Sequence, residues 1–302
     1  MTNAFLFPGQ ASQYVGMGKD LVEHHTRARE LFEHANDIMG TDLMRICFEG
    51  PADVLTQTKY TQPAIFVHSV IIAELCGITP TAAAGHSLGE YSALVTAQAL
   101  SFDDGLRLVK KRGELMQEAG TRSPGTMAAV IGADADLVND VCTDISTSDV
   151  VQAANFNSPG QIVISGSIDG VDKAMQALKA RGVRLVKKLP VSGAFHSPLM
   201  QYAQDELAAA LADTPIRNAT FAVYANVTGN AVASAEAIRD NLLMQVTSPV
   251  LWERSMENMI RDGVERFYET GPGNVLQGLL KRINGELSCI TIGTHDELMT
   301  LK

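Results

Sequence analysis

The sequence predicts an α/β fold with a largely parallel sheet, interrupted by a small inserted domain of the ferredoxin-like (βαββαβ) type. Two observations lead to this prediction. Short apolar runs alternate with amphipathic helical patterns in both end regions of the chain, and such alternation is typical of parallel sheets. Between residues 122 and 191 the order changes to strand, helix, strand, strand, helix, strand, which is the ferredoxin-like signature. We therefore expect one domain over 1–121 and 192–302 and an inserted domain over 122–191.

The first part of the chain reads as a buried strand followed by helices. "NAFLF" at 3–7 is a short apolar run that ends in a Pro-Gly turn. Helical periodicity follows at 28–39 and 63–75. The small residues at 81–87 predict a short central strand, and a helix is expected from 88 to 100. A further helix over 101–120 opens with a capping box, Ser101 to Asp104, and stops at Gly120.

The inserted domain and the last third of the chain complete the pattern. In the insertion, strands are expected at 126–132, 150–157, 161–166 and 183–191, and helices at 135–146 and 169–182. After "HSPLM" a helix is expected to reach Ala212, with further helices at 235–245, 251–261 and 274–283. The remaining strands are predicted at 220–226, 264–271 and 288–293.

Composition excludes several classes of protein. The chain has 302 residues, 46% hydrophobic and 19% charged, as in ordinary globular proteins. The net charge of −10 argues against a nucleic-acid-binding protein, which would present a basic face. The most apolar region, 64–84, is interrupted by His68, Glu74 and Pro80, so it predicts no membrane span. Since the N-terminus lacks the basic start of a signal peptide, we expect a cytoplasmic protein.

The cysteines give no sign of a metal site. Cys47, Cys76, Cys142 and Cys289 lie far apart in apolar surroundings, and none forms a C-x-x-C pair. We expect four buried free thiols and no bound metal.

"GHSLG" at 85–89 places Ser87 between two glycines, after a predicted strand and before a predicted helix. This order is typical of a nucleophile elbow, a strained turn that needs glycines and exposes the serine at a helix N-terminus. The alternative is a serine that only caps the following helix. The local pattern does not choose between the two.

A nucleophilic serine needs a base, and two of the seven histidines are candidates. His196 lies where the chain leaves the inserted domain, and His295 lies beside Asp296; the junction position favours His196. His86 adjoins Ser87, and its side chain should point elsewhere. His68 is expected to be a core histidine with its hydrogen bonds satisfied. The other three, which we expect to be solvated, are His24, His25 and His34.

Four segments in this order, "FLFPGQASQYVGMG", "GHSLGEYSALV", "LVKKRGELMQEA" and "PVSGAFHSPLM", closely resemble the malonyl-CoA:acyl carrier protein transacylases. That family includes discrete enzymes and the acyltransferase domains of polyketide synthases. "ANFNSPGQIVISG", "SPVLW" and "ETGPGNVLQGLLKRI" also match, so the resemblance runs from about Phe5 to Ile283. It implies an α/β-hydrolase-like core with an inserted ferredoxin-like domain.

The resemblance assigns a role to five residues at the reacting centre. Ser87 would carry the acyl group, and His196 would be the catalytic base. The backbone N–H groups of Gln10 and Leu88 would form the oxyanion hole. The main-chain carbonyl of Gln245 would orient the histidine, so that no third carboxylate is needed.

The resemblance also assigns substrate recognition. Arg112 would bind the free carboxylate of the malonyl group, although the basic run from Lys110 to Arg112 is also typical of a solvated face. Phe195 would crowd an α-methyl branch, or it is simply part of the core. The chain departs from the family at Ala11, where a glycine is usual, so the first loop is expected to be slightly altered.

The implied activity is transfer of malonyl from malonyl-CoA to the phosphopantetheine thiol of acyl carrier protein through a malonyl-serine. No metal or bound cofactor is implied, because coenzyme A and pantetheine enter as substrates. We expect a monomer that docks the carrier protein on local basic surface, with "VKKR", "RGVRLVKK" and "LLKR" as candidates. The motifs do not separate fatty-acid from polyketide synthesis. Two rivals stay open: a serine thioesterase or esterase with His295 as base, and an inactive carrier-protein-binding module.

Overall fold

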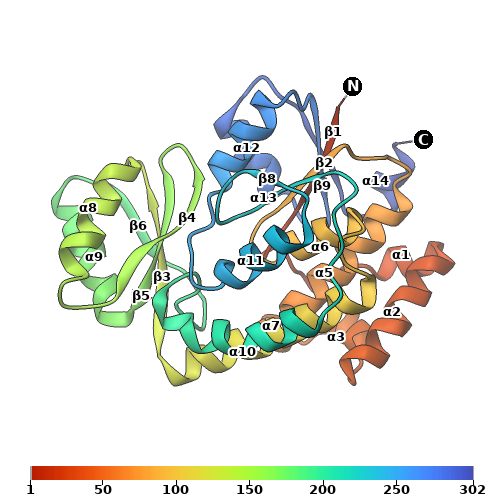
Figure 1. The fold of residues 1–302 in the computed structure, drawn as a ribbon, viewed down its shortest axis with the longest axis horizontal. Helices are drawn as coiled ribbons and strands as arrows, with labels where there is room; N and C mark the ends of the chain where they lie inside the picture. The colour runs from red at the N-terminus through yellow and green to blue at the C-terminus, as the bar shows by residue number, and fades with distance from the viewer. Residues whose placement is uncertain (1, 302) are drawn as a thin grey trace.

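The computed structural model describes residues 2–301 and contains two β-sheets (Figure 1). In the larger one, sheet A, the strand order is β10-β9-β1-β2-β7-β8. All neighbouring strands are parallel except β7 and β8. The predicted largely parallel sheet is therefore confirmed. Its strands are β1 Asn3–Phe7, β2 Ala82–Gly85, β7 Ala222–Tyr224, β8 Ala231–Val232, β9 Arg266–Thr270 and β10 Cys289–Ile292.

The apolar side chains of β1 point alternately to the two faces of sheet A, so both faces must be covered by helices. Phe5 and Phe7 belong to one buried cluster, whereas Ala4 and Leu6 belong to another that includes Trp252. Successive side chains of a strand point to opposite faces, and a buried parallel strand needs apolar residues on both. The first face is covered mainly by α2 Thr26–Met39, α5 Thr58–Leu75, α6 Gly89–Thr96, α7 Phe102–Arg122, α10 Gln201–Asp213 and α11 Ala235–Gln245, and the second by α12 Trp252–Arg261 and α13 Val275–Ile283.

Sheet B is a separate antiparallel sheet with the strand order β4-β5-β3-β6. With its two helices it gives the predicted order β-α-β-β-α-β, and it lies apart from sheet A at the left of Figure 1. The predicted ferredoxin-like unit is confirmed. Its elements are β3 Gly125–Ile131, α8 Ala135–Ile145, β4 Val151–Ser158, β5 Gln161–Ser167, α9 Ile168–Ala180 and β6 Leu185–Lys188.

The unit around sheet B is attached to the rest of the chain by backbone hydrogen bonds. The amide of Phe156 donates to the carbonyl of Val250 at 2.9 Å, and the amide of Val250 donates to the carbonyl of Ala154 at 2.9 Å. These bonds fix β4 beside the segment that precedes α12. The two sheets therefore have a defined relative position, and residues of both can line one cavity.

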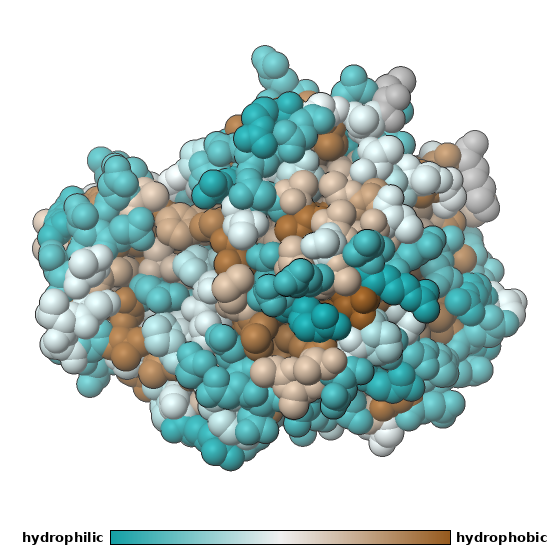
Figure 2. Space-filling model, viewed as in Figure 1, coloured by the Kyte–Doolittle hydropathy of each residue, from teal (hydrophilic) through white to brown (hydrophobic). Residues whose placement is uncertain are grey.

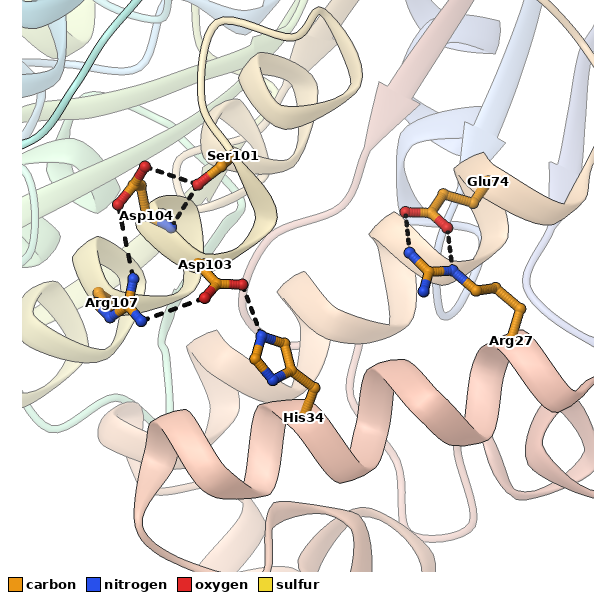
Figure 3. Close-up of polar contacts among 7 residues, drawn as sticks. All are labelled: Arg27, His34, Glu74, Ser101, Asp103, Asp104 and Arg107. Carbon is orange, nitrogen blue, oxygen red and sulfur yellow. Dashed lines mark hydrogen bonds and ion pairs between the residues drawn. The ribbon is translucent and has the colours of Figure 1, made fainter.

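The N-terminal helices α1 Lys19–His24, α2, α3 Leu43–Glu49 and α4 Ala52–Leu55 lie on the α5 and α7 side of sheet A (Figure 1). Figure 3 shows polar contacts from α2 to α5 and α7, and within the first turn of α7. Arg27 on α2 pairs with Glu74 on α5 at 2.8 Å, and His34 on α2 bonds to Asp103 on α7 at 2.7 Å. Because these side chains are exposed, each pair contributes little to stability, on the order of 0 to 1 kcal/mol. Burial of the apolar faces accounts for the packing.

The ends of several elements differ from the sequence prediction. Helix α5 begins at Thr58 and not at residue 63, and β6 and β7 are shorter than expected. The predicted cap of α7 is present, since Ser101 accepts from the amide of Asp104 at 3.0 Å, but the helix runs past Gly120 to Arg122. A Cβ at Gly120 would lie 2.4 Å from the carbonyl oxygen of Ser192. This glycine therefore permits close packing and does not end the helix. The helix after Ser87 is also shorter than predicted: α6 ends at Thr96.

The short elements η1 Pro198–Met200 and α14 His295–Met299 complete the fold. The surface seen in Figure 2 is mostly hydrophilic, with hydrophobic residues in small groups. Over residues 2–301, no helix is both long and apolar enough to cross a membrane. The four cysteines are free and buried as predicted, and burial raises the pKa of Cys47 to about 12.

Candidate active site

The serine of "GHSLG" sits on the predicted strand–turn–helix unit. β2 ends at Gly85, α6 begins at Gly89, and Ser87 between them has a φ of 52°. A Cβ at Gly85 would lie 1.8 Å from the carbonyl carbon of Gly89, and a Cβ at Gly89 would lie 2.1 Å from the oxygen of Phe7. Both glycines are therefore required by backbone contacts. Ser87 does not cap α6, because no side-chain cap bond is formed there.

Ser87 is hydrogen-bonded to His196. The Oγ of Ser87 lies 2.8 Å from Nε2 of His196. The Nδ1 of the same ring lies 2.8 Å from the carbonyl oxygen of Gln245, so Nδ1 carries the proton and Nε2 is free to accept one. Gln152 of β4 donates to the His196 carbonyl at 2.7 Å and holds its backbone, which has a φ of 57°.

The electrostatics keep His196 neutral. Burial lowers the pKa of His196 to about 3, and the nearby Arg112 guanidinium acts in the same direction. A neutral imidazole can act as a general base, whereas an imidazolium cannot. The geometry thus provides a serine, a base and a carbonyl that fixes the tautomer, without a third carboxylate.

Arg112 is buried beside the serine. Its Nη2 donates to Oγ of Ser87 at 3.0 Å and to Oε1 of Gln245 at 2.9 Å, and its Nη1 donates to Oε1 of Gln62 at 2.7 Å. The interpretation of this basic run as a solvated face is therefore wrong for Arg112, which is 1% exposed. None of the ion pairs among residues 2–301 includes it. A buried guanidinium held only by neutral acceptors is ready to bind an anion.

The loop after β1 packs against the serine turn. A Cβ at Gly9 would lie 2.6 Å from the carbonyl oxygen of His86, so only glycine permits this approach. Gln10 and Leu88 both line the cavity at Ser87. In the described part of the chain, neither of their backbone N–H groups has a hydrogen-bond partner. Two free donors beside a nucleophile match the requirement of an oxyanion hole.

The cavity at Ser87 has a volume of about 220 Å³ and lies between the two sheets. From sheet A and its helices it is lined by Ser87, Gln62, Arg112, Val275 and Leu279; sheet B contributes Met127, Asn155, Asn157, Gln161 and Val163. Phe195 is buried and also lines it. A mostly apolar cavity with a few convergent polar groups is typical of a small-molecule site.

Within residues 2–301, no other histidine is hydrogen-bonded to the serine. His295 bonds to Nε2 of His25 at 3.0 Å and stacks on the ring of His24 at 4.0 Å. It is not the partner of Ser87, so the base expected by the rival hydrolase hypothesis is not in place. His86 points to Asn157 at 2.8 Å. His68 is fully buried as predicted; neither ring nitrogen has a partner at normal hydrogen-bond geometry, and the backbone at Gly293 acts on its pKa as a hydrogen bond does.

Sequence reasoning missed the polar groups behind the reacting centre: the side chains of Gln62, Glu90, Asn226 and Gln245. Glu90 is the one with a usable signal, because it is the single charged residue in the helical run predicted at 88–100. No cluster of three or more metal-ligating side chains occurs within residues 2–301.

A serine on a strained strand–helix turn, bonded to a neutral histidine and flanked by free backbone donors, is the arrangement of enzymes that form acyl-serine intermediates. The comparison with known proteins gives the family. Residues 4–283 match the model of the acyl transferase domain family, so the chain belongs to the acyl transferase domain family.

Individual relatives agree over nearly the whole length. The malonyl CoA-acyl carrier protein transacylase of Bacillus subtilis (strain 168) is 44% identical, with 98% of this chain and 94% of that protein covered. The solved malonyl CoA-acyl carrier protein transacylase of Coxiella burnetii has a TM-score of 0.96 at 38% identity and covers 99% of this chain and 96% of its own. A malonyl-transacylase in complex with a type II polyketide acyl-carrier protein has a TM-score of 0.96 at 40% identity, covering 100% and 99%.

Proposed function

We propose that this chain transfers a malonyl group from malonyl-CoA to the phosphopantetheine thiol of acyl carrier protein. The observation that carries the proposal is the buried Arg112, whose Nη2 lies 3.0 Å from Ser87 Oγ and which forms no ion pair among the described residues. Malonyl-CoA would supply the missing carboxylate beside the thioester carbon that Ser87 attacks. The named activity of the relatives supports the same reaction.

In the first half-reaction, Oγ of Ser87 attacks the thioester carbonyl carbon while Nε2 of His196 takes the hydroxyl proton. The N–H groups of Gln10 and Leu88 stabilise the oxyanion, each contributing about 10²- to 10³-fold in rate. The tetrahedral intermediate collapses, the C–S bond breaks, and the coenzyme A sulfur takes the proton from His196. Ser87 is left as a malonyl ester, and Arg112 holds its carboxylate.

In the second half-reaction, His196 takes the proton of the pantetheine thiol, and the sulfur attacks the malonyl ester carbon. Collapse breaks the bond to Ser87 Oγ, which regains the proton from His196. The carrier protein leaves as its malonyl thioester, so the kinetics are ping-pong. Phe195 would restrict the site to acyl groups without an α-branch, and no metal or resident cofactor is needed.

The experiment is exposure of the protein to malonyl-CoA, followed by intact mass measurement and peptide mapping. A malonyl adduct on the Ser87 peptide, discharged by holo acyl carrier protein, is the expected result. Continuous release of free malonate would favour a thioesterase, and the absence of any adduct would favour an inactive binding module. An adduct on another peptide, or a Ser87→Ala variant that still acylates, would contradict the assignment of the nucleophile.

The carrier-protein surface belongs to the same proposal. Of the three basic segments, the first supplies the buried Arg112 and a Lys110 that bonds to the carbonyls of Ile38 and Met39. Lys111 of that segment is exposed and stays a candidate docking residue, as do Lys187 of β6 and Lys281 of α13. Charge reversal at these three positions should raise the KM for carrier protein and leave self-malonylation unchanged.

Three further expectations accompany the proposal. The chain would act as a monomer in the cytoplasm, with residues 122–191 forming the inserted domain. Light scattering coupled to gel filtration tests the first, and localisation of a tagged protein tests the second. Separate expression of residues 122–191 tests whether they fold alone.

A further inference from the structure

Glu90 is a buried acid directly behind the active site. It is the second residue of α6, three positions after Ser87, and only 1% of it is exposed. Its side chain does not line the cavity, so it does not touch a bound acyl group. Burial of a carboxyl group is costly unless hydrogen bonds compensate. Burial raises the pKa of Glu90 to about 7, against the opposing effects of its two hydrogen bonds and of Arg112.

The carboxylate is held by two neutral donors from different segments. Its Oε2 accepts from the backbone amide of Asn226 at 3.0 Å and from Nε2 of Gln245 at 2.8 Å. None of the ion pairs among residues 2–301 includes Glu90. A salt bridge therefore does not explain why an acid occupies this position.

The first connection runs through Gln245 to Arg112. The Nε2 of Gln245 donates to Glu90 and to the carbonyl of Ser87 at 3.0 Å, which turns its Oε1 toward Nη2 of Arg112 at 2.9 Å. With the amide reversed, its NH₂ group would face the guanidinium, and two donors would oppose each other. Glu90 is the closest of three acceptors of Nε2, the others being the Ser87 carbonyl and Oδ1 of Asn226 at 3.3 Å, and it strengthens the amide orientation that holds Arg112 beside Ser87.

The second connection runs through Asn226 to the serine turn. The side-chain Oδ1 of Asn226 accepts from the amide of Ser87 at 2.7 Å, and its Nδ2 donates to the carbonyl of Gly85 at 2.7 Å. Asn226 thus spans the turn on which Ser87 has a positive φ. Because Glu90 accepts from the backbone of Asn226, it fixes that residue against the turn.

We propose that Glu90 is a positioning residue for acyl transfer: its carboxylate holds Gln245 and Asn226, and through them sets the guanidinium of Arg112 and the turn that bears Ser87. The proposal rests on the proposed function, since Arg112 selects malonyl only in that reaction. The residue acts through its two partners and does not itself exchange a proton with the substrate.

The test compares kcat/KM for malonyl-CoA and acetyl-CoA in Glu90→Leu and Glu90→Gln variants, with folding checked by circular dichroism and thermal unfolding. Acetyl-CoA has no carboxylate, so a merely structural loss of folded protein would lower both values equally. Glu90→Leu removes the closest acceptor of Gln245 Nε2 and leaves the weaker-held amide with the Ser87 carbonyl and Oδ1 of Asn226. It should lower malonyl transfer by about 10²-fold, the cost of a small misplacement, and acetyl transfer less. Glu90→Gln retains an acceptor oxygen, so the misplacement of its partners should be smaller. Its kcat/KM for malonyl-CoA should stay within about 10-fold of the wild-type value.

A matched control is Glu269→Gln, a change at another buried acid, which accepts from the amides of Leu276 and Gln277 and has no bond to Gln245. Its malonyl-to-acetyl ratio should equal that of wild type. If Glu90→Leu does not fold, Glu90→Asp, which withdraws the carboxylate by one methylene, carries the same test.

Wild-type kcat/KM values for both thioesters in a folded Glu90→Leu or Glu90→Asp variant would overturn the role of Glu90. Equal losses for both thioesters would overturn the connection through Gln245 to Arg112, because only the connection through Asn226 to the Ser87 turn lowers both alike. Failure of the proposed function would be distinguishable, because the wild-type protein would then not be malonylated at all.

Discussion

The Nη2 atom of Arg112 lies 3.0 Å from the Oγ atom of Ser87. The cationic group is therefore in contact with the oxygen that becomes acylated in the proposed reaction. Its other hydrogen bonds go to the amide oxygens of Gln62 and Gln245, which carry no charge. The site thus contains a buried positive charge without a protein counter-charge in bonding distance, and a substrate carboxylate would neutralise it.

Loss of the Arg112 guanidinium should remove the preference for malonyl over acetyl. Removing one member of a desolvated charge pair costs on the order of 2–5 kcal/mol, and acetyl-CoA does not form that pair. We expect Arg112→Ala to depress kcat/KM for malonyl-CoA strongly and for acetyl-CoA little. Arg112→Lys should recover only part, because an ammonium loses the planar two-pronged geometry.

The control for this measurement is Arg107→Ala, a change on the same helix at an exposed arginine that pairs with Asp103 and Asp104 (Figure 3). It should leave both kcat/KM values unchanged. Equal losses for malonyl and acetyl in Arg112→Ala would show that Arg112 supports the fold or binds coenzyme A, and the account of specificity would be wrong.

His196 should remain uncharged well below the usual titration range of histidine. Burial, reinforced by Arg112, lowers its pKa to about 3. In a ¹⁵N-histidine-labelled protein, the ring shifts of His196 should therefore stay those of the neutral Nδ1–H tautomer between pH 7 and pH 5. Assignment comes from the spectrum of His196→Ala. Protonation of this ring near pH 6.5 would contradict the buried geometry.

Two variants, His196→Ala and His295→Ala, test which histidine is the base. General-base loss costs about 10²- to 10⁴-fold, so His196→Ala should lose most malonyl transfer. His295→Ala should behave as wild type, because its ring contacts His24 and His25 and not the serine. An essential His295 beside a dispensable His196 would restore the hydrolase hypothesis.

The parts of the site that the sequence predicted are those with a local signature. Gly85 and Gly89 flank Ser87 at fixed spacing because the turn brings their backbones into contact. The continuous apolar run in "NAFLF" reflects a strand buried on both faces. Position at a domain junction favoured His196, but only the resemblance gave a role to Arg112. The polar groups behind them come from α5, α6, α11 and the segment after β7, and no spacing rule connects such distant residues.

The departure at Ala11 has a measurable cost. Ala11 is exposed and has a φ of 84°, a left-handed conformation that glycine adopts without strain. We expect Ala11→Gly to raise the free energy of unfolding by about 1 kcal/mol, since a Cβ at positive φ costs roughly that amount. The measurement is urea unfolding.

The matched control for Ala11→Gly is Ala209→Gly, at an exposed alanine in the middle of α10. There glycine should destabilise by about 1 kcal/mol, because it weakens a helix interior. If both variants lose stability, the strain at Ala11 is relieved in some other way and the prediction is wrong.

Buried His68 should make the fold sensitive to acid. Burial lowers its pKa to about 4, with Asp20 and the backbone at Gly293 opposing. The unfolded chain, with an ordinary histidine pKa, therefore binds more protons between about pH 6.5 and pH 4, and stability falls as the pH falls through this window.

By this linkage, His68 should account for a loss of about 2 kcal/mol in the free energy of unfolding between pH 7 and pH 5. His68→Leu should remove that part of the slope. Urea unfolding followed by the fluorescence of Trp252, the single tryptophan, measures the slope. Equal slopes in wild type and His68→Leu would mean that His68 is protonated in the folded state, where a hydrogen-bond partner would then have to reach it.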